Sequence, residues 1–212
     1  SKLKSSNFNR FIVTLLFMLN LTLMITPVSG YLTPILIGTD PSHDSPTRID
    51  ILEVYLTNNG THFRFIIKCR SVPSPSKSTV YRVYLDTKGG GTHDKVYKGA
   101  DYYLEAKDDS YLYEWKKGKK HGAWEKKSPI EVQIDAANKT ISLTASLSDI
   151  GYPKDVRKKV GIVVATFQPS KSLRDRAPDK GNYAVAHQVI PELPWPTPVV
   201  FIPAVVATVY TI

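Results

Sequence analysis

The feature that most constrains this fold is a series of short segments in which apolar and polar residues alternate, separated by turn signals. Residues 49–69, IDILEVYLTNNGTHFRFIIKC, contain two such segments joined by the pair Asn59-Gly60. An Asn-Gly pair favours a type I′ turn, because both central positions of that turn need positive φ. In the second segment Phe63 and Phe65 alternate with polar residues, which is the two-residue period of a β-strand. The stretch therefore predicts a β-hairpin.

The same pattern continues along the chain. It predicts single strands over residues 81–87 and 100–109, hairpins over 111–127 and 130–146, and a last strand over 160–168. The last of these, VGIVVATFQ, is nearly all apolar, which is typical of a strand buried on both faces. We find no convincing amphipathic helix between these segments. We therefore predict an all-β fold, an antiparallel and jelly-roll-like β-sandwich of about eight strands.

Apolar segments flank this predicted domain, which spans residues 31–190. Residues 1–30 carry three basic residues, then an apolar run, then small residues, in the order of a secretory signal peptide. Cleavage before Tyr31 is one expectation, and an uncleaved N-terminal anchor is the alternative. In both cases we expect the domain to be exported, either secreted or held at the cell surface.

Residues 191–212 form a Pro-rich lead-in and a hydrophobic tail that has no charge after Glu192. If the tail were wholly helical it would be about 30 Å long, which matches the core of a bilayer. Pro198 and Pro203 oppose such a helix. The residues after Pro203 are mostly β-branched or aromatic, which favours a strand. Two alternatives follow: a tail that associates with the membrane, and a strand or docking segment.

Charge and cysteine content narrow the classes of partner. The chain has 28 Lys and Arg against 19 Asp and Glu, a formal net charge of +9. This basic charge is compatible with nucleic-acid binding. We nevertheless predict no nucleic-acid partner, because the leader predicts export and the sequence carries no recognised nucleic-acid fold signature. Cys69 is the single cysteine, so neither an intrachain disulfide nor a cysteine metal site is expected. The turn sequons at Asn59 and Asn138 are candidate glycosylation sites.

The predicted hairpin over residues 111–127 combines aromatic and basic side chains. The candidate binding residues are Tyr111, Tyr113, Trp115, Lys116, Lys117, Lys119, Lys120 and Trp124. Aromatic faces stack on sugar rings, and lysines pair with acidic glycans or phospholipid headgroups. Trp115 and Trp124 are placed to be neighbours across the hairpin. The alternative is that the aromatic residues face the core and the lysines cover a solvated tip.

Acidic residues in the loops are candidate ligands for a structural calcium ion. They are Asp40, Asp44, Asp86, Asp94 and Asp101. Calcium takes six to eight oxygen ligands, and Gly-rich loops allow carbonyl groups to converge on it. The spacing is not that of an EF-hand, and acidic loop residues also act simply as turn formers.

The sequence gives no reason to predict an enzyme. Its five histidines form no HExxH motif, and no G-x-S-x-G elbow is present. The carboxylates of Glu105, Asp108 and Asp109 resemble the charged ends of an ordinary hairpin. Both methionines, Met18 and Met24, lie in the leader, so no methionine ligand for haem would remain after its removal.

The order of several motifs carries a family resemblance. DPSHD, YRVYLDT, GADYYLE, LYEW, SDIG and DRAPDKG follow one another between residues 38 and 188. This region resembles the extracellular β-sandwich domains similar to family 9 carbohydrate-binding modules and to the DOMON superfamily. The resemblance implies a surface protein that binds sugars, haem or no known ligand. Pro191-Glu192-Leu193 before the apolar tail is similar to the PEF-type sorting signals of archaeal surface proteins.

Three functions are compatible with these features. The leading hypothesis is a non-enzymatic cell-surface or secreted protein that binds a glycan or a cell-envelope polymer. The second is a structural subunit that self-assembles into a surface layer or filament, with the β-branched tail adding a strand to a neighbour. The third is an accessory subunit of a membrane-anchored redox or glycan-processing complex.

Overall fold

The computed structural model describes residues 30–88, 91–92, 96–117, 122–151 and 159–186. These residues form twelve strands and one short 3-10 helix, η1 (Pro169–Lys171). The strands are β1 (Ile35–Thr39), β2 (Ile51–Asn58), β3 (His62–Cys69), β4 (Val80–Asp86), β5 (Tyr102–Ala106), β6 (Tyr111–Lys116), β7 (Ala123–Pro129), β8 (Glu131–Asp135), β9 (Thr140–Ser146), β10 (Lys159–Gln168), β11 (Leu173–Ala177) and β12 (Tyr183–Ala186).

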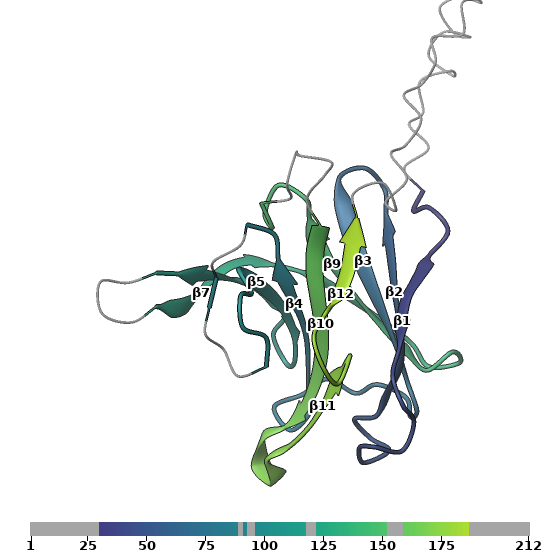
Figure 1. Ribbon diagram of the computed structural model, residues 1–212. Helices are drawn as coiled ribbons and strands as arrows, with labels where there is room; N and C mark the ends of the chain where they lie inside the picture. The colour runs from purple at the N-terminus through teal and green to yellow at the C-terminus, as the bar shows by residue number, and fades with distance from the viewer. Residues whose placement is uncertain (1–29, 89–90, 93–95, 118–121, 152–158, 187–212) are drawn as a thin grey trace, which may run out of the picture. The chain divides into compact units, whose positions relative to one another are not determined.

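The strands form two antiparallel sheets that pack together as a sandwich (Figure 1). One sheet has the order β1-β2-β3-β9-β8, and the other has the order β11-β10-β4-β5-β6-β7, with β12 also paired to β10. The predicted all-β fold is therefore confirmed. The predicted number of about eight strands is too low, because β1, β11 and β12 are short and lack a clear alternation in the sequence.

The predicted hairpin over residues 49–69 is formed by β2 and β3. Its return strand alternates as predicted, with Phe63 and Phe65 fully buried between partly exposed residues. The turn differs from the predicted type I′, since Gly60 has a φ of 86° but Asn59 is not in the positive region. Instead the Asn59 side-chain oxygen accepts hydrogen bonds from the backbone N–H groups of Thr61 and His62. An Asx-type turn thus replaces the expected geometry.

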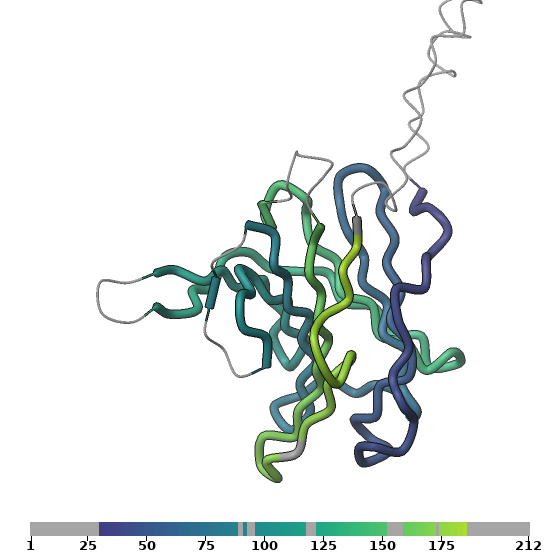
Figure 2. Tube along the Cα trace, in the orientation of Figure 1, coloured from purple at the N-terminus to yellow at the C-terminus, as the bar shows by residue number. Residues whose placement is uncertain are grey.

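Strand β10 pairs with three other strands of the second sheet. It pairs with β4 along one side, and β11 and β12 pair with successive halves of its other side. Most of its residues are buried, which confirms the prediction of a strand covered on both faces. Figure 2 shows β12 running beside β1, and the Tyr183 ring lies against Gly38, where a Cβ atom would come within 2.0 Å of it. The last described strand therefore closes the sandwich against the first.

The hydrophobic core lies between the two sheets. In β4 Tyr81, Val83 and Leu85 are all fully buried there. Leu104 of β5 and Leu112 of β6 extend the same core. The predicted hairpins over 111–127 and 130–146 are confirmed as β6–β7 and β8–β9. The β6–β7 hairpin extends sideways beyond the rest of the sandwich (Figure 1).

The two apolar ends lie outside the described residues, and so do the predicted leader (1–30, except Gly30) and tail (191–212). Within the described part of the chain, no helix has the length and hydrophobicity that crossing a bilayer requires.

Truncation of a core side chain should test the burial of this sandwich. Leu104→Ala removes a side chain of zero exposure and leaves a cavity, so we expect the free energy of unfolding to fall by about 2–5 kcal/mol. Leu36→Ala is the matched control, because Leu36 is 48% exposed and its loss should cost less than about 1 kcal/mol. Urea unfolding followed by tryptophan fluorescence measures both. Equal losses for the two variants would contradict the core described above.

Candidate functional site

The two tryptophans of the β6–β7 hairpin face each other. Trp115 and Trp124 are direct partners in the strand register, and their rings are 5.4 Å apart in an edge-to-face arrangement. The predicted contact across the hairpin is thereby confirmed. The Trp115 ring also lies over Gly122, where any Cβ atom would come within 2.1 Å of it. A glycine at the hairpin turn therefore leaves the space that this ring occupies.

The aromatic side chains of the hairpin lie on the outer face of the seven-stranded sheet, away from the main core. Neighbouring positions on this face carry Tyr84 and Tyr103, which belong to a second apolar cluster. Tyr113 stacks on Tyr103 with centroids 4.6 Å apart, and Trp124 meets the same ring edge-on at 4.6 Å. Tyr113, Trp115 and Trp124 remain partly exposed. Tyr84 and Tyr103 are themselves buried in this cluster together with Val96 and Tyr97, so the hairpin aromatics form its partly exposed edge.

This row continues across the sheet through an arginine. The guanidinium of Arg82 lies 4.7 Å from the centroid of the Tyr103 ring and 5.1 Å from that of Phe167. Arg82 also pairs with the buried carboxylate of Glu105 at 2.6 Å. Beyond Phe167 an open hollow of about 210 Å³ is lined by Val80, Arg82, Phe167, Pro169, Ser172 and Arg174. We call this set the aromatic strip: the partly exposed Trp115, Trp124, Tyr113, Arg82 and Phe167, with the buried rings of Tyr103 and Tyr84 that support them.

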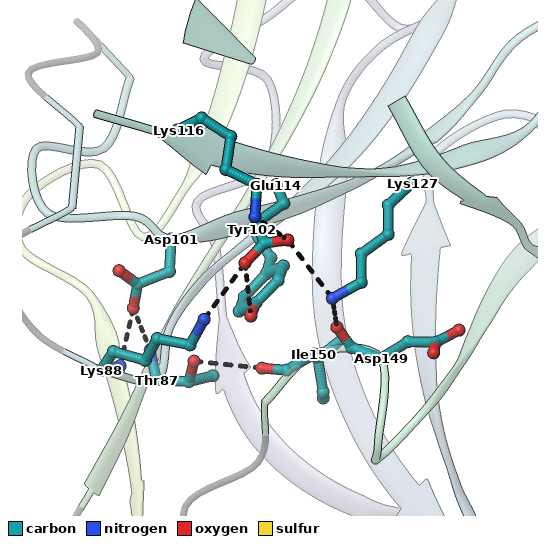
Figure 3. Close-up of polar contacts among 9 residues, drawn as sticks. All are labelled: Thr87, Lys88, Asp101, Tyr102, Glu114, Lys116, Lys127, Asp149 and Ile150. Carbon is teal, nitrogen blue, oxygen red and sulfur yellow. Dashed lines mark hydrogen bonds and ion pairs between the residues drawn. The ribbon is translucent and has the colours of Figure 1, made fainter. Parts of the chain in front are cut away.

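The predicted lysines do not all accompany the aromatic residues. Successive residues of a strand point to opposite faces, and Lys116 follows Glu114 on the face opposite to Trp115. There the Lys116 ammonium binds the Glu114 carboxylate at 2.7 Å (Figure 3). Lys117 is exposed just after β6, and Lys119 and Lys120 lie outside the described residues.

Basic residues that were not predicted lie beside the aromatic strip. The Lys126 ammonium lies 3.2 Å from the centroid of the Tyr111 ring, and Lys107 binds Glu105 at 2.8 Å. Arg174 is exposed and sits opposite Phe167 in the strand register. None of Arg82, Lys107, Lys126, Phe167 and Arg174 is among the predicted site residues. The alternation within each strand is visible in the sequence, but which strands lie side by side is not.

Glu114 is the centre of a charge network that anchors the hairpin (Figure 3). Its carboxylate accepts from Lys88 at 3.2 Å and from the Tyr102 hydroxyl at 3.2 Å, and it pairs with Lys127 at 3.4 Å. Lys127 also donates to the backbone carbonyl of Asp149 at 2.6 Å. Burial by itself would raise the pKa of Glu114, but the hydrogen bonds from Lys116 and Lys88 and the charge of Lys127 lower it to about 2. The network joins the hairpin to two loops of the sandwich.

Two of the five predicted calcium ligands lie close together in the structure. Carboxylate oxygens of Asp40 and Asp44 lie within 4.8 Å of each other and of Asp175, which is not among the predicted ligands. Asp101 instead caps a turn, accepting the backbone N–H groups of Thr87 and Lys88 at 2.9 and 2.6 Å. Asp86 ends β4 and is not a member of the acidic group, and Asp94 lies outside the described residues.

Electrostatic repulsion is concentrated at this acidic group. Burial, followed by the charges of Asp175, Asp179, Asp44 and Asp50, raises the pKa of Asp40 to about 8. Burial raises the pKa of Asp175 as well, against its hydrogen bonds to the backbone N–H of Ile51 and to Ser45. All three ligand candidates offer oxygen, the donor that hard cations prefer. The group is therefore suited to bind such a cation.

Both predicted glycosylation sites lie in hairpin turns. Asn59 is partly exposed between β2 and β3, and Asn138 is exposed between β8 and β9. The Asn138 amide nitrogen donates to the Asp135 carboxylate at 2.6 Å. Glycosylation of either residue stays a prediction.

No protein-family model matches the chain, and no curated protein sequence is significantly similar to it. The resemblance to carbohydrate-binding and DOMON domains therefore stays a prediction. Inference about function depends on the chemistry of the described side chains.

Loss of the Glu114 charge should weaken the hairpin anchor. Glu114→Gln leaves three lysines without their shared counter-ion, and we expect the free energy of unfolding to fall by about 1 kcal/mol at pH 7. The folded pKa of about 2 is below the ordinary 4.5, so the wild-type contribution is present above pH 4.5 and is lost as the pH falls toward 2. Urea unfolding at pH 7 and pH 3 should show a smaller difference between wild type and variant at pH 3.

The matched control is Glu125→Gln, an exposed residue that faces Glu114 in the strand register. It should change the free energy of unfolding little at either pH. A Glu114→Gln variant as stable as wild type at pH 7 would show that the network does not anchor the hairpin.

Proposed function

We propose that the protein is a non-enzymatic β-sandwich that binds a glycan or cell-envelope polymer across the aromatic strip. The observation that carries this proposal is the row of partly exposed aromatic rings on the outer face of the sheet, supported from beneath by Tyr84 and Tyr103. Sugar rings present apolar C–H faces, and they stack on aromatic side chains that are already held in place. A row of such rings across several strands suits a polymer better than a single small molecule.

The charge beside the strip favours an acidic polymer. Arg82, Lys107, Lys126 and Arg174 lie along this face. Among the described residues, Glu105 and, at the end of β4, Asp86 are acidic residues on the same face. A basic surface raises the local concentration of an anionic ligand and speeds its association. The net charge of +9 for the whole chain acts in the same direction. We therefore propose a uronic-acid or phosphate-bearing polymer in preference to a neutral glucan.

The proposed location is the outside of the cell. It rests on the signal-like composition of residues 1–30, and the hydrophobic tail is proposed to hold the domain near the membrane. The two turn sequons are consistent with an exported domain.

Affinity electrophoresis in gels containing polygalacturonate or a neutral glucan tests the proposed ligand. Trp115→Ala should weaken retention by polygalacturonate about three- to tenfold, the equivalent of one aromatic contact. Arg174→Ala should weaken it too, and raising the salt from 0.05 to about 0.5 M should remove most of the effect of this substitution.

The matched controls keep residue type and change position. Tyr55→Ala removes a partly exposed aromatic ring from β2, and Arg48→Ala removes an exposed arginine from the loop before β2. Both controls should be retained like wild type, and a thermal melt of each variant checks that it is folded. Equal retention of all five proteins would remove the aromatic strip as the binding site.

Self-assembly is the second candidate, and one edge strand favours it. Edge strand β8 carries Glu131 and Asp135 in exposed positions, which opposes pairing with another chain. Edge strand β1 instead leaves Leu36 48% exposed. If the tail adds a strand to β1 of a neighbour, the purified chain should form filaments visible by electron microscopy. Deletion of residues 195–212 should abolish them, and filaments that persist after the deletion would contradict this role of the tail.

A further inference from the structure

An acidic group joins two parts of the chain that are far apart in sequence. Asp40 directly follows β1, Asp44 lies in the loop before β2, and Asp175 lies in β11. One carboxylate oxygen from each is within 4.8 Å of the others. In Figure 2 the β1–β2 loop and the β11 segment both lie at the lower end of the sandwich.

Asp40 is the member of this group whose carboxylate is buried without any hydrogen-bond partner. It is only 8% exposed, and neither of its carboxylate oxygens has a hydrogen-bond partner. One oxygen of the fully buried Asp50, in the same loop, also has none. A buried carboxylate without a partner is strongly unfavourable unless a cation or hydrogen-bond donors compensate it.

The arginines near this group do not supply that compensation. Arg70 pairs with the other oxygen of Asp50 at 3.5 Å. The guanidinium of Arg176 donates to the backbone carbonyls of Val96 at 2.9 Å and Gly181 at 2.6 Å, and also to that of Pro178. Arg70 thus compensates Asp50, and Arg176, although its charge interacts with that of Asp40, donates no hydrogen bond to it. The two unpaired oxygens of the buried Asp40 point to a small cation that the protein binds from solution.

We propose that Asp40, Asp44 and Asp175 bind one calcium ion that fastens the β1–β2 loop to β11. Two ligand oxygens on opposite sides of a calcium ion are about 4.8 Å apart, because each Ca–O distance is about 2.4 Å. The observed spacing of these oxygens is within that limit. The exposed Asp44 leaves one side of the site open to water ligands. The ligand set has neither sulfur nor nitrogen, which disfavours zinc.

The surrounding hydrogen bonds hold the site in place. Asp175 accepts the backbone N–H of Ile51 at 2.6 Å and the Ser45 hydroxyl at 2.9 Å. The backbone N–H of His43 donates to Asp50 at 3.0 Å, and His43 itself has a φ of 75°, a conformation that few non-glycine residues adopt. The loop is therefore folded around the three carboxylates. Magnesium, which keeps several waters in a strict octahedron, suits this all-carboxylate pocket less well.

Thermal melting of the full chain tests this assignment. The protein is freed of divalent ions with EDTA, dialysed, and melted with no addition, with CaCl₂ and with MgCl₂. Calcium at about 100-fold its dissociation constant should raise the Tm by about 5–10 °C, and magnesium at equal concentration should raise it less. Isothermal titration with CaCl₂ should give one site per chain.

Asp40→Asn is the decisive variant, because the Asp40 carboxylate has no hydrogen-bond partner to lose. In EDTA it should melt close to the wild-type temperature, because the substitution removes no hydrogen bond. It should also lose most of the shift caused by calcium. Asp44→Asn provides a second variant with the same expected loss. Asp109→Asn, an exposed residue outside the acidic group, is the control and should keep the full shift.

Any of three results would overturn the proposal. A wild-type Tm unchanged by calcium, or an Asp40→Asn variant that keeps the full shift, excludes this site. A larger shift with magnesium than with calcium excludes the calcium assignment. The outcome does not depend on the proposed glycan binding, which the electrophoresis of the aromatic-strip variants tests separately.

Discussion

Each sheet buries one face in the shared core, and this burial determines which side chains point inward and which point outward along every strand. Tyr81, Val83 and Leu85 of β4 point into the core, so Arg82 and Tyr84 must point outward. The same alternation in β6 sends Tyr113 and Trp115 to the outer face and Glu114 to the opposite one. The aromatic strip and the Glu114 network are therefore consequences of core packing, separated by the thickness of one sheet.

Two clusters of charge show opposite ways of accommodating a carboxyl group that is largely shielded from solvent. Glu114 has three lysines and a tyrosine hydroxyl around it, and its pKa is held low. Asp40 is buried among further carboxylates, and its pKa is raised. The first cluster is satisfied by the protein's own side chains and serves to position the hairpin. In the second, no described residue forms an ion pair or hydrogen bond with the Asp40 carboxylate, and this deficit motivates the calcium proposal.

The alternation of side chains made the central strands predictable. Hairpins β2–β3, β6–β7 and β8–β9 each combine a regular pattern with a turn signal, and the contact of Trp115 with Trp124 follows from their equal distance to the turn. Strand β11, LRDRA, has three consecutive charged residues and no apolar run. It is held by pairing with β10 and by the bonds of Asp175, which a local pattern does not reveal.

By itself the sequence determined the fold class, most of the strands and the presence of an aromatic, basic hairpin, because these depend on residues near one another in the chain. Only the tertiary structure decided which groups meet. It placed Arg82 and Phe167 on the same face as the hairpin aromatics and brought Asp175 to Asp40. The physical reason is that strands distant in sequence become neighbours through sheet order and sandwich packing, and local alternation specifies neither.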